Sequence, residues 1–161
     1  MFIALGIIYP VFFHWIGLGK IFLPMFWPLA AAGFFLPLSV CIAVGTLTPL
    51  LSFLISGMPP PPILYLMIVE LSVLTVGVHL VHHRWHPGNF WAILSGLILS
   101  RFATLGMAWL IGPLLGLPPG LYAFKQIIEG LPGILAILLI IPLIVSKLTR
   151  TYLFRSQAPH V

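Results

Sequence analysis

Proline and glycine divide a nearly continuous apolar sequence into runs of the length that crosses a lipid bilayer. These runs lack the strict polar–apolar alternation of barrel strands, so helices must satisfy the backbone hydrogen bonds inside lipid. About 20 helical residues cross the hydrocarbon core of a bilayer. The pattern therefore predicts an all-α bundle of about six transmembrane helices, over residues 2–16, 24–38, 39–56, 63–81, 90–111 and 122–146.

The breaks between these runs are polar or rich in residues that end helices. Residues 57–62 include four successive prolines, which cannot donate backbone hydrogen bonds, and residues 82–89 are mostly polar. The join between the second and third runs is marked only by Pro37 and Ser39. Within the last run, Pro132 and Pro142 predict kinks.

Composition excludes a soluble protein. Of the 161 residues, 61% are hydrophobic and 6% are charged, whereas a soluble domain carries about a quarter charged residues. Residues 1–161 fit one compact bundle, and we expect the N-terminal run to be a retained first helix, since Met1 to Ile8 show no basic region and no clear cleavage site. Cys41, the single cysteine, is expected to be a small packing residue.

The net charge of +5 is explained by orientation signals, and nucleic acid is excluded as a partner, because the basic residues lie near the ends of the spans. Six spans place both termini on the same side. If that side is the cytoplasm, four basic residues lie inside and two outside, as the positive-inside rule favours. The inner group is Arg84, Lys147, Arg150 and Arg155, and the outer pair is Lys20 and Lys125.

Two charged residues fall inside predicted spans, where a charge is costly unless it is paired or solvated. Glu70 lies in the fourth span and Arg101 in the fifth, each near the middle. One interpretation is an ion pair between them that fixes helix packing. The other makes Glu70 a substrate ligand that faces a central cavity.

Polar and aromatic residues also gather at the predicted outer side. Lys125 and Glu129 share a helix face next to Gln126, and they form either a solvated helix-end pair or the wall of a pocket. A second candidate wall surrounds the first outer loop, although tryptophans at such positions often only anchor a helix at the interface. Its members are His14, Trp15, Lys20, Met25, Phe26 and Trp27.

Two further patterns allow more than one interpretation. A stripe of histidines at helical spacing indicates either a polar helix end or a transition-metal site, although no carboxylate lies nearby in sequence to complete it. The fifth span carries a small residue at every fourth position, which packs inside the bundle or meets another subunit. The stripe is His79, His82, His83 and His86, and the seam is Ala92, Gly96, Ser100, Thr104 and Ala108.

Residues 22–70 resemble the substrate-binding S component of energy-coupling factor (ECF) transporters. The similar elements are Phe22-Leu23-Pro24-Met25, the run Leu47-Thr48-Pro49-Leu50-Leu51-Ser52-Phe53-Leu54, the segment Gly57-Met58-Pro59-Pro60, and the intramembrane Glu70. The chain length, the six spans and the basic C-terminal segment also match this family. The first helix departs from it, because Ala4 is followed four residues later by Ile8 in place of the second alanine of an Ala-x-x-x-Ala motif.

The resemblance implies a substrate-capture subunit of the prokaryotic plasma membrane that is not an enzyme. Such a subunit binds a vitamin or related micronutrient from outside and docks onto a transmembrane T component driven by two cytoplasmic ATPase subunits. The ligand would lie near the outer face, among Lys20, Met58, Glu70, Lys125 and Glu129. Riboflavin-like, thiamine-like, pantothenate-like and cobalamin-like ligands all remain open.

The predicted binding site thus combines Arg101 with the outer candidates above, and we expect no bound cofactor or metal. Two alternatives remain. A small intramembrane metal-dependent enzyme would use Glu70 and the histidines, and a non-catalytic membrane assembly subunit would use the small-residue seam of the fifth span.

Overall fold

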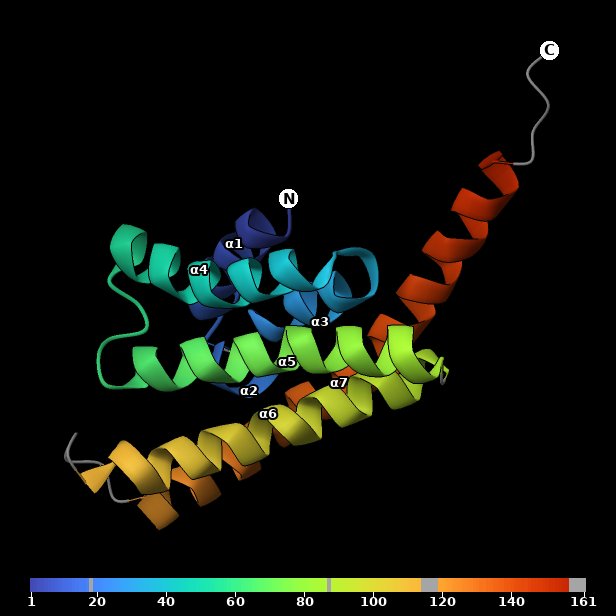
Figure 1. Cartoon of the computed structure of the whole chain (residues 1–161). Coiled ribbons are helices and arrows are strands. Elements are labelled where there is room, and N and C mark those ends of the chain that lie inside the picture. Colours follow the sequence, from blue (N-terminus) through green and yellow to red (C-terminus); the bar gives the residue numbers. More distant parts are fainter. Residues whose placement is uncertain (18, 87, 114–118, 157–161) are drawn as a thin grey trace.

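The structure is a computed structural model that describes residues 1–17, 19–86, 88–113 and 119–156. Within these ranges the side chains at 20, 111, 119–127 and 150–156 are not described. The described residues are mostly helical. No strand occurs in the described ranges, so the predicted all-α fold is confirmed (Figure 1). In chain order the helices are α1 (Phe2–Trp15), α2 (Gly19–Phe22), α3 (Phe26–Phe35), α4 (Leu38–Ser56), α5 (Ile63–Trp85), α6 (Asn89–Ile111) and α7 (Pro119–Ser156).

Membrane character is confirmed by the length and hydropathy of the helices. Four are long and apolar enough to cross a bilayer: α4, α5, α6 and the Ile128–Thr149 part of α7. The other two apolar helices, α1 and α3, are shorter, and the 10 residues of α3 rise only about 15 Å at 1.5 Å per residue. The chain is therefore a bundle of six apolar helices that includes two short ones.

The long helices α4, α5 and α6 form an antiparallel row in which each packs on the next (Figure 1). Glycines permit the close approach between neighbours. A Cβ atom at Gly45 of α4 would lie 2.5 Å from the Ser72 Cα of α5, and one at Gly96 of α6 would lie 2.5 Å from a methyl group of Val78. The row is thus held by backbone-to-backbone packing, the usual means of helix association in lipid.

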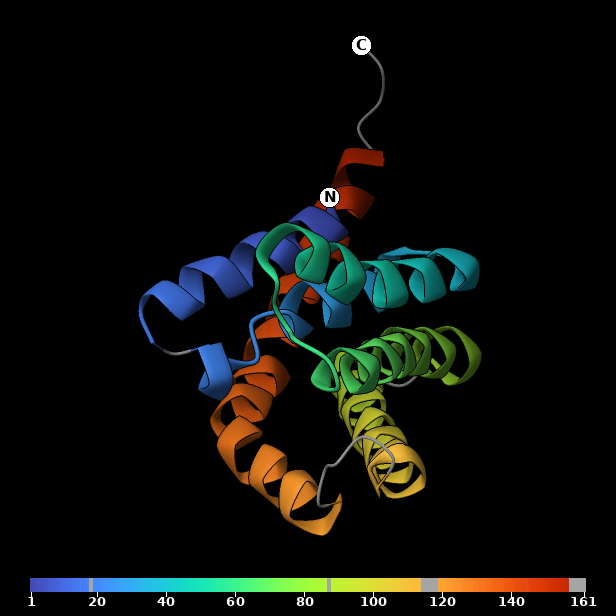
Figure 2. The same ribbon diagram turned by 90° about the vertical axis from the view of Figure 1, so that its left-hand side faces the viewer.

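The short helix α3 lies at the centre of the bundle, where it contacts α1, α4, α5 and α7 (Figure 2). Most of its residues are buried, including Phe26, Leu29 and Phe34. Gly33 allows α3 to approach α5, since a Cβ there would come within 2.9 Å of the Thr75 carbonyl oxygen. The sequence predicts this helix at 24–38, but in the structure it spans only Phe26–Phe35. Pro24 and Pro37 both lie outside the helix.

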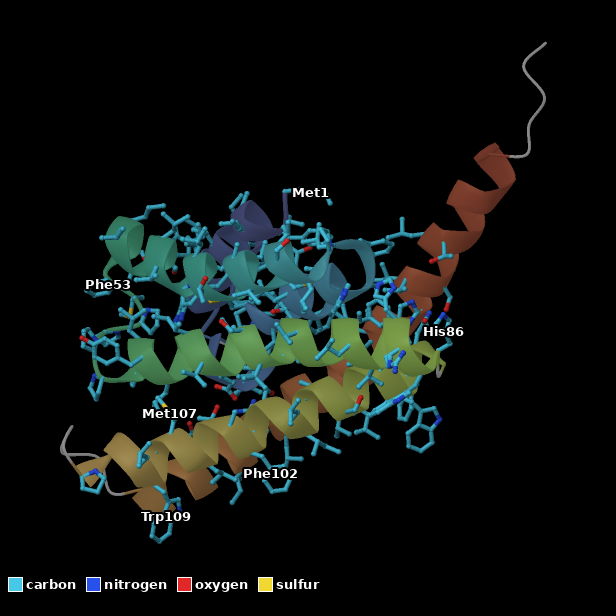
Figure 3. The ribbon with its side chains drawn as sticks, in the orientation of Figure 1. Met1, Phe53, His86, Phe102, Met107 and Trp109 are labelled. Carbon is cyan, nitrogen blue, oxygen red and sulfur yellow. The ribbon has the colours of Figure 1, made fainter. Side chains whose placement is uncertain are left out.

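The outer surfaces of the helices are apolar, as expected of residues that face lipid. Phe102 and Trp109 project from the face of α6 that points away from α5 (Figure 3), and both are about two-thirds exposed. Leu139 and Leu143 of α7 are exposed to a similar extent. Cys41, in contrast, is fully buried in α4, which agrees with its predicted packing role.

Helix α7 is longer than the predicted span 122–146. It contains Pro132 and Pro142, and its C-terminal part turns away from the direction of α5 and α6 (Figure 1). The predicted kinks therefore agree with the structure, because proline removes a backbone hydrogen bond inside a helix. The Asn89 amide donates to the Ser146 hydroxyl at 3.1 Å, which joins this part of α7 to the start of α6.

Candidate functional site

The two intramembrane charges predicted from the sequence meet in the interior. The Arg101 Nη1 atom lies 2.6 Å from the Glu70 Oε1 atom, which confirms the predicted ion pair. The Glu70 side chain is fully buried and that of Arg101 is 12% exposed. The pair joins α5 to α6 and removes the cost of two isolated charges in an apolar interior.

Glu70 lies off centre along α5, and Arg101 lies near the middle of α6. At 1.5 Å per residue, Glu70 is about 10 Å along α5 from Ile63, and Arg101 is about 15 Å along α6 from Ile111. Both of these helix ends lie on the side of the loop at 57–62, because α5 and α6 are antiparallel. Glu70 therefore lies in the half of α5 nearer that loop, and Arg101 lies close to the middle of α6.

Helix α3 supplies an aromatic surface for the guanidinium group. The Arg101 Cζ atom lies 5.2 Å from the centre of the Phe26 ring, a cation–π distance. The preceding turn fixes the ring, because Trp27 Nε1 donates to the Phe22 carbonyl at 2.8 Å and the Phe26 N–H donates to the Leu23 carbonyl at 2.9 Å. Leu23 itself has a φ of 47°, a left-handed conformation that leucine rarely adopts.

Helix α7 leaves space for this cluster through two glycines. A Cβ atom at Gly130 would lie 3.1 Å from Leu23 and 3.6 Å from Arg101 Nη2, and one at Gly133 would lie 2.6 Å from the Ile21 carbonyl oxygen. Residue 133 thus lets α2 pack directly on α7, and residue 130 lets the Arg101 side chain extend toward α7. Helices α3, α5, α6 and α7 all converge on one guanidinium group.

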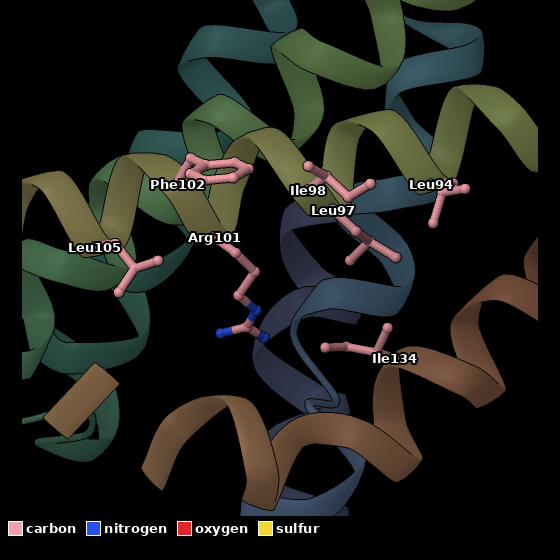
Figure 4. A pocket seen from close by; sticks show the side chains of 7 residues that line it. All are labelled: Leu94, Leu97, Ile98, Arg101, Phe102, Leu105 and Ile134. Atoms are coloured by element: carbon pink, nitrogen blue, oxygen red, sulfur yellow. The ribbon is translucent and has the colours of Figure 1, made fainter. Parts of the chain in front are cut away.

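A cavity of about 270 Å³ lies between α6 and α7, and the Arg101 side chain borders it with its nitrogen atoms buried (Figure 4). Its other walls are entirely apolar side chains, and its rim includes the exposed residues Ile98 and Phe102. This volume is slightly below the range of about 300–1,000 Å³ that is typical of ligand sites. The lining residues are Leu94, Leu97, Ile98, Arg101, Phe102, Leu105 and Ile134.

The Arg101 donors are only partly used. The Arg101 Nε and Nη2 atoms are buried and have no hydrogen-bond partner within the described ranges. The contact with Glu70 has the distance of a charge-assisted hydrogen bond but not its alignment. These nitrogen atoms are buried, so the surface that the cavity presents is apolar.

The structure brings together part of the predicted binding set. Met25, Phe26, Glu70 and Arg101 are all buried or nearly so, and Trp27 packs against the same core. The other described members lie at the surface and do not line the cavity: His14, Trp15, Met58 and Glu129. The side chains of Lys20, Lys125 and Gln126 lie outside the described residues.

Helix α5 extends beyond the predicted end at residue 81 to Trp85, so most of the histidine stripe lies on this helix. The His79 and His83 ring centres are 4.4 Å apart, those of His82 and His83 are 5.1 Å apart, and His82 packs edge-on against Phe34. Among the described residues, no three histidine, cysteine or carboxylate side chains are grouped closely enough to hold a metal ion. The stripe therefore packs as aromatic rings at the end of α5.

The small-residue seam of α6 is buried inside the bundle. Gly96 packs against Val78 and Leu74 of α5, and Ser100 and Thr104 donate to carbonyl groups of their own helix. All five members, including Ala92 and Ala108, are buried. The intramolecular interpretation of the seam is confirmed.

Sequence reasoning did not identify the apolar walls of the cavity or the glycines beside it. Ile98, Leu105 and Ile134 look like any lipid-facing residue when they are read along one helix. Gly130 and Gly133 carried the only signal, since two glycines three residues apart mark a possible close approach. Comparison with models of protein families, with curated proteins and with solved structures finds no match for this chain.

Proposed function

We propose that the chain is the substrate-capture subunit of an ECF-type ATP-driven importer, which binds a vitamin or related micronutrient from the outer side of the prokaryotic plasma membrane. The observation that carries the proposal is the buried Glu70–Arg101 pair beside the cavity between α6 and α7. Ionisable groups inside a membrane protein usually mark a site of transport or binding. The resemblance of residues 22–70 to S components supplies the transporter class.

The position of the site supports capture from outside. Glu70 lies in the half of α5 nearer the loop at 57–62, which the positive-inside rule assigns to the outer side. Arg84, at the end of α5, and Lys147, next to the Asn89–Ser146 bond, both lie toward the opposite end. The proposed polarity thus has a basic inner end and a binding site displaced outward.

The proposal assigns ATP hydrolysis to two cytoplasmic subunits and coupling to a transmembrane T component. The chain's own role is to bind the ligand and release it inside. This function is favoured over that of an assembly subunit because the α6 seam is already used within the chain. It is favoured over that of a metal-dependent enzyme because the described histidines pack on one another and on Phe34, away from the ion pair.

The test is uptake in cells that express the chain with a T component and two ATPases. Micronutrient depletion from the medium would be measured with wild-type ATPases and with ATPases whose Walker A lysines are replaced. The proposal predicts that uptake requires both the chain and ATP hydrolysis. Uptake that continues unchanged with the inactive ATPases would contradict the coupled-importer function.

A further inference from the structure

We propose that the cavity between α6 and α7 holds one acyl chain of an anionic phospholipid, whose headgroup lies at the Asn89 end of α6. The inference goes beyond the proposed function, because it assigns a membrane lipid to the lipid-facing flank of Arg101. The buried ion pair behind that flank is left to the captured micronutrient.

The cavity has the shape of a hydrocarbon chain. Its α6 residues, from Leu94 to Leu105, recur at the three- and four-residue spacing of one helix face, and Ile134 of α7 lies across from them (Figure 4). At 1.5 Å per residue this stretch covers about 16 Å, roughly half of a hydrocarbon core about 30 Å thick. A volume of about 270 Å³ spread over that length is long and narrow, and its extent matches the depth of one lipid leaflet.

The lining and the opening of the cavity both favour hydrocarbon. The accessible lining is entirely apolar, since the Arg101 nitrogen atoms are buried. Phe102 at the rim is about two-thirds exposed and projects from the lipid-facing side of α6 (Figure 3), and Ile98 is about half exposed. A polar ligand would lose its hydrogen bonds to water there without replacement, whereas an acyl chain would enter sideways from the bilayer and lose none.

The packing of α6 explains why a space remains on this side. Toward α5 the two backbones come close, since a Cβ atom at Gly77 would lie 3.2 Å from the Gly96 Cα atom. Toward α7 the same helix presents large side chains, among them Leu94, Leu97 and Leu105. Large side chains keep the α6 and α7 backbones apart, and an empty gap between them would forfeit dispersion contacts. A chain from the surrounding lipid restores these contacts.

The charges at the two ends of the cavity select the headgroup. At one end Lys147 is exposed, next to the hydrogen bond between Asn89 and Ser146. The chain has two acidic residues, and neither lies there: Glu70 is in the interior, and Glu129 lies about 25 Å along α7 from Ser146. An anionic headgroup is therefore attracted to the Asn89 end and repelled from the Glu129 end. The positive-inside rule assigns the Asn89 end to the inner leaflet.

Native mass spectrometry of the full chain tests this assignment, because it counts the lipids that stay bound after release from detergent. Delipidated protein would be titrated with phosphatidylglycerol and phosphatidylcholine that carry identical oleoyl chains. We expect one tight phosphatidylglycerol per chain, bound about fivefold more tightly than phosphatidylcholine, the preference that one lysine near a headgroup provides. Dihexanoyl phosphatidylglycerol has the same headgroup but chains too short to fill the cavity, and it should bind at least about tenfold more weakly than the oleoyl lipid.

Four variants locate the lipid. Ile134→Phe fills the cavity and should abolish the tight binding, whereas Leu139→Phe adds the same ring at an exposed position of α7 and should bind like the wild type. Lys147→Gln should remove the preference for phosphatidylglycerol, and Lys147→Arg should keep it. The two Lys147 variants change an exposed side chain, so they test the inference even if Ile134→Phe does not fold.

Three results would overturn the inference. They are equal binding of the two oleoyl lipids by the wild type, tight binding that survives Ile134→Phe, and a dimer whose formation excludes the lipid and is lost in Ile134→Phe. The proposed function is judged separately, because this titration needs neither the T component nor the ATPases. Selective lipid binding without any ATP-driven uptake would leave the inference standing and contradict the importer.

Discussion

Arg101 is the residue on which four helices of the bundle converge. It is paired with Glu70 from α5, faces the Phe26 ring from α3, and has Gly130 of α7 beside Nη2. Truncation of one partner of a buried pair is costly because it leaves the other charge desolvated and unpaired. The guanidinium group is therefore paired with Glu70, while its buried Nε and Nη2 atoms have no hydrogen-bond partner in the described part of the chain.

The structural part of this role predicts strong coupling between the two charges. Glu70→Gln and Arg101→Met should each lower the free energy of unfolding by about 3–5 kcal/mol, because each removes one member of a buried ion pair. The double variant should lose clearly less than the sum of the two. Reversible unfolding in mixed SDS micelles, followed by circular dichroism, measures all three. Additive losses would show that the two side chains do not interact.

At this scale the sequence predicted the charged centre but not its surroundings. Glu70 and Arg101 stood out because ionised residues are rare inside apolar runs. Phe26 and Met25 were expected near the site and are buried in the core beside it. Trp15 was expected in the wall around the first outer loop, and Met58 in the pocket that the resemblance implies, yet both are exposed. Interfacial aromatic and loop residues look alike in sequence whether they anchor a helix or bind a ligand.

At the scale of elements, close backbone approach holds the row of long helices. Gly45 lies against backbone atoms of Ser72, so neither helix can yield to an added side chain without moving as a whole. In lipid this packing takes the place of the hydrophobic effect that joins helices in water.

Paired glycine substitutions test this packing. Gly45→Ala should lower the free energy of unfolding by about 1–3 kcal/mol, because its Cβ would meet Ser72 Cα at 2.5 Å. Gly106→Ala is the matched control, since a Cβ there meets nothing within 4 Å. The control should be neutral or stabilised by up to about 1 kcal/mol, as alanine favours helix. Equal effects in the same unfolding assay would argue against glycine-mediated contact between α4 and α5.

Helix positions were largely predictable because apolar run length and prolines set them. The predicted spans 39–56 and 90–111 match α4 and α6 to within one residue at each end. The short α2 was missed, since its four residues have no periodicity, and α5 and α7 extend past their apolar runs into polar sequence. Helix continues there because His82, His83 and Lys147 are compatible with helical backbone even where lipid ends.

At the scale of the whole molecule, the bundle combines an apolar outer face with a charged pair buried in its interior. Lipid-facing residues such as Phe102 and Leu139 surround an interior in which Arg101 is the polar group of a small cavity. The cavity is lined by residues of both α6 and α7. The sequence pattern of a single helix does not show how two helices pack, so it could not locate the cavity. Glu70 lies toward the end of α5 at the loop 57–62, whereas Arg84 and Lys147 lie toward the opposite end of the bundle.

The central claim is that this bundle captures a small molecule at the Glu70–Arg101 site. The most direct measurement is mass spectrometry of small molecules that copurify with the full chain and with Glu70→Gln/Arg101→Met, each checked for helical content. We predict a single vitamin-sized compound that is bound to the wild type in near-stoichiometric amount and absent from the variant. A wild-type protein without such a compound after growth in rich medium, or equal amounts in both proteins, would contradict the claim.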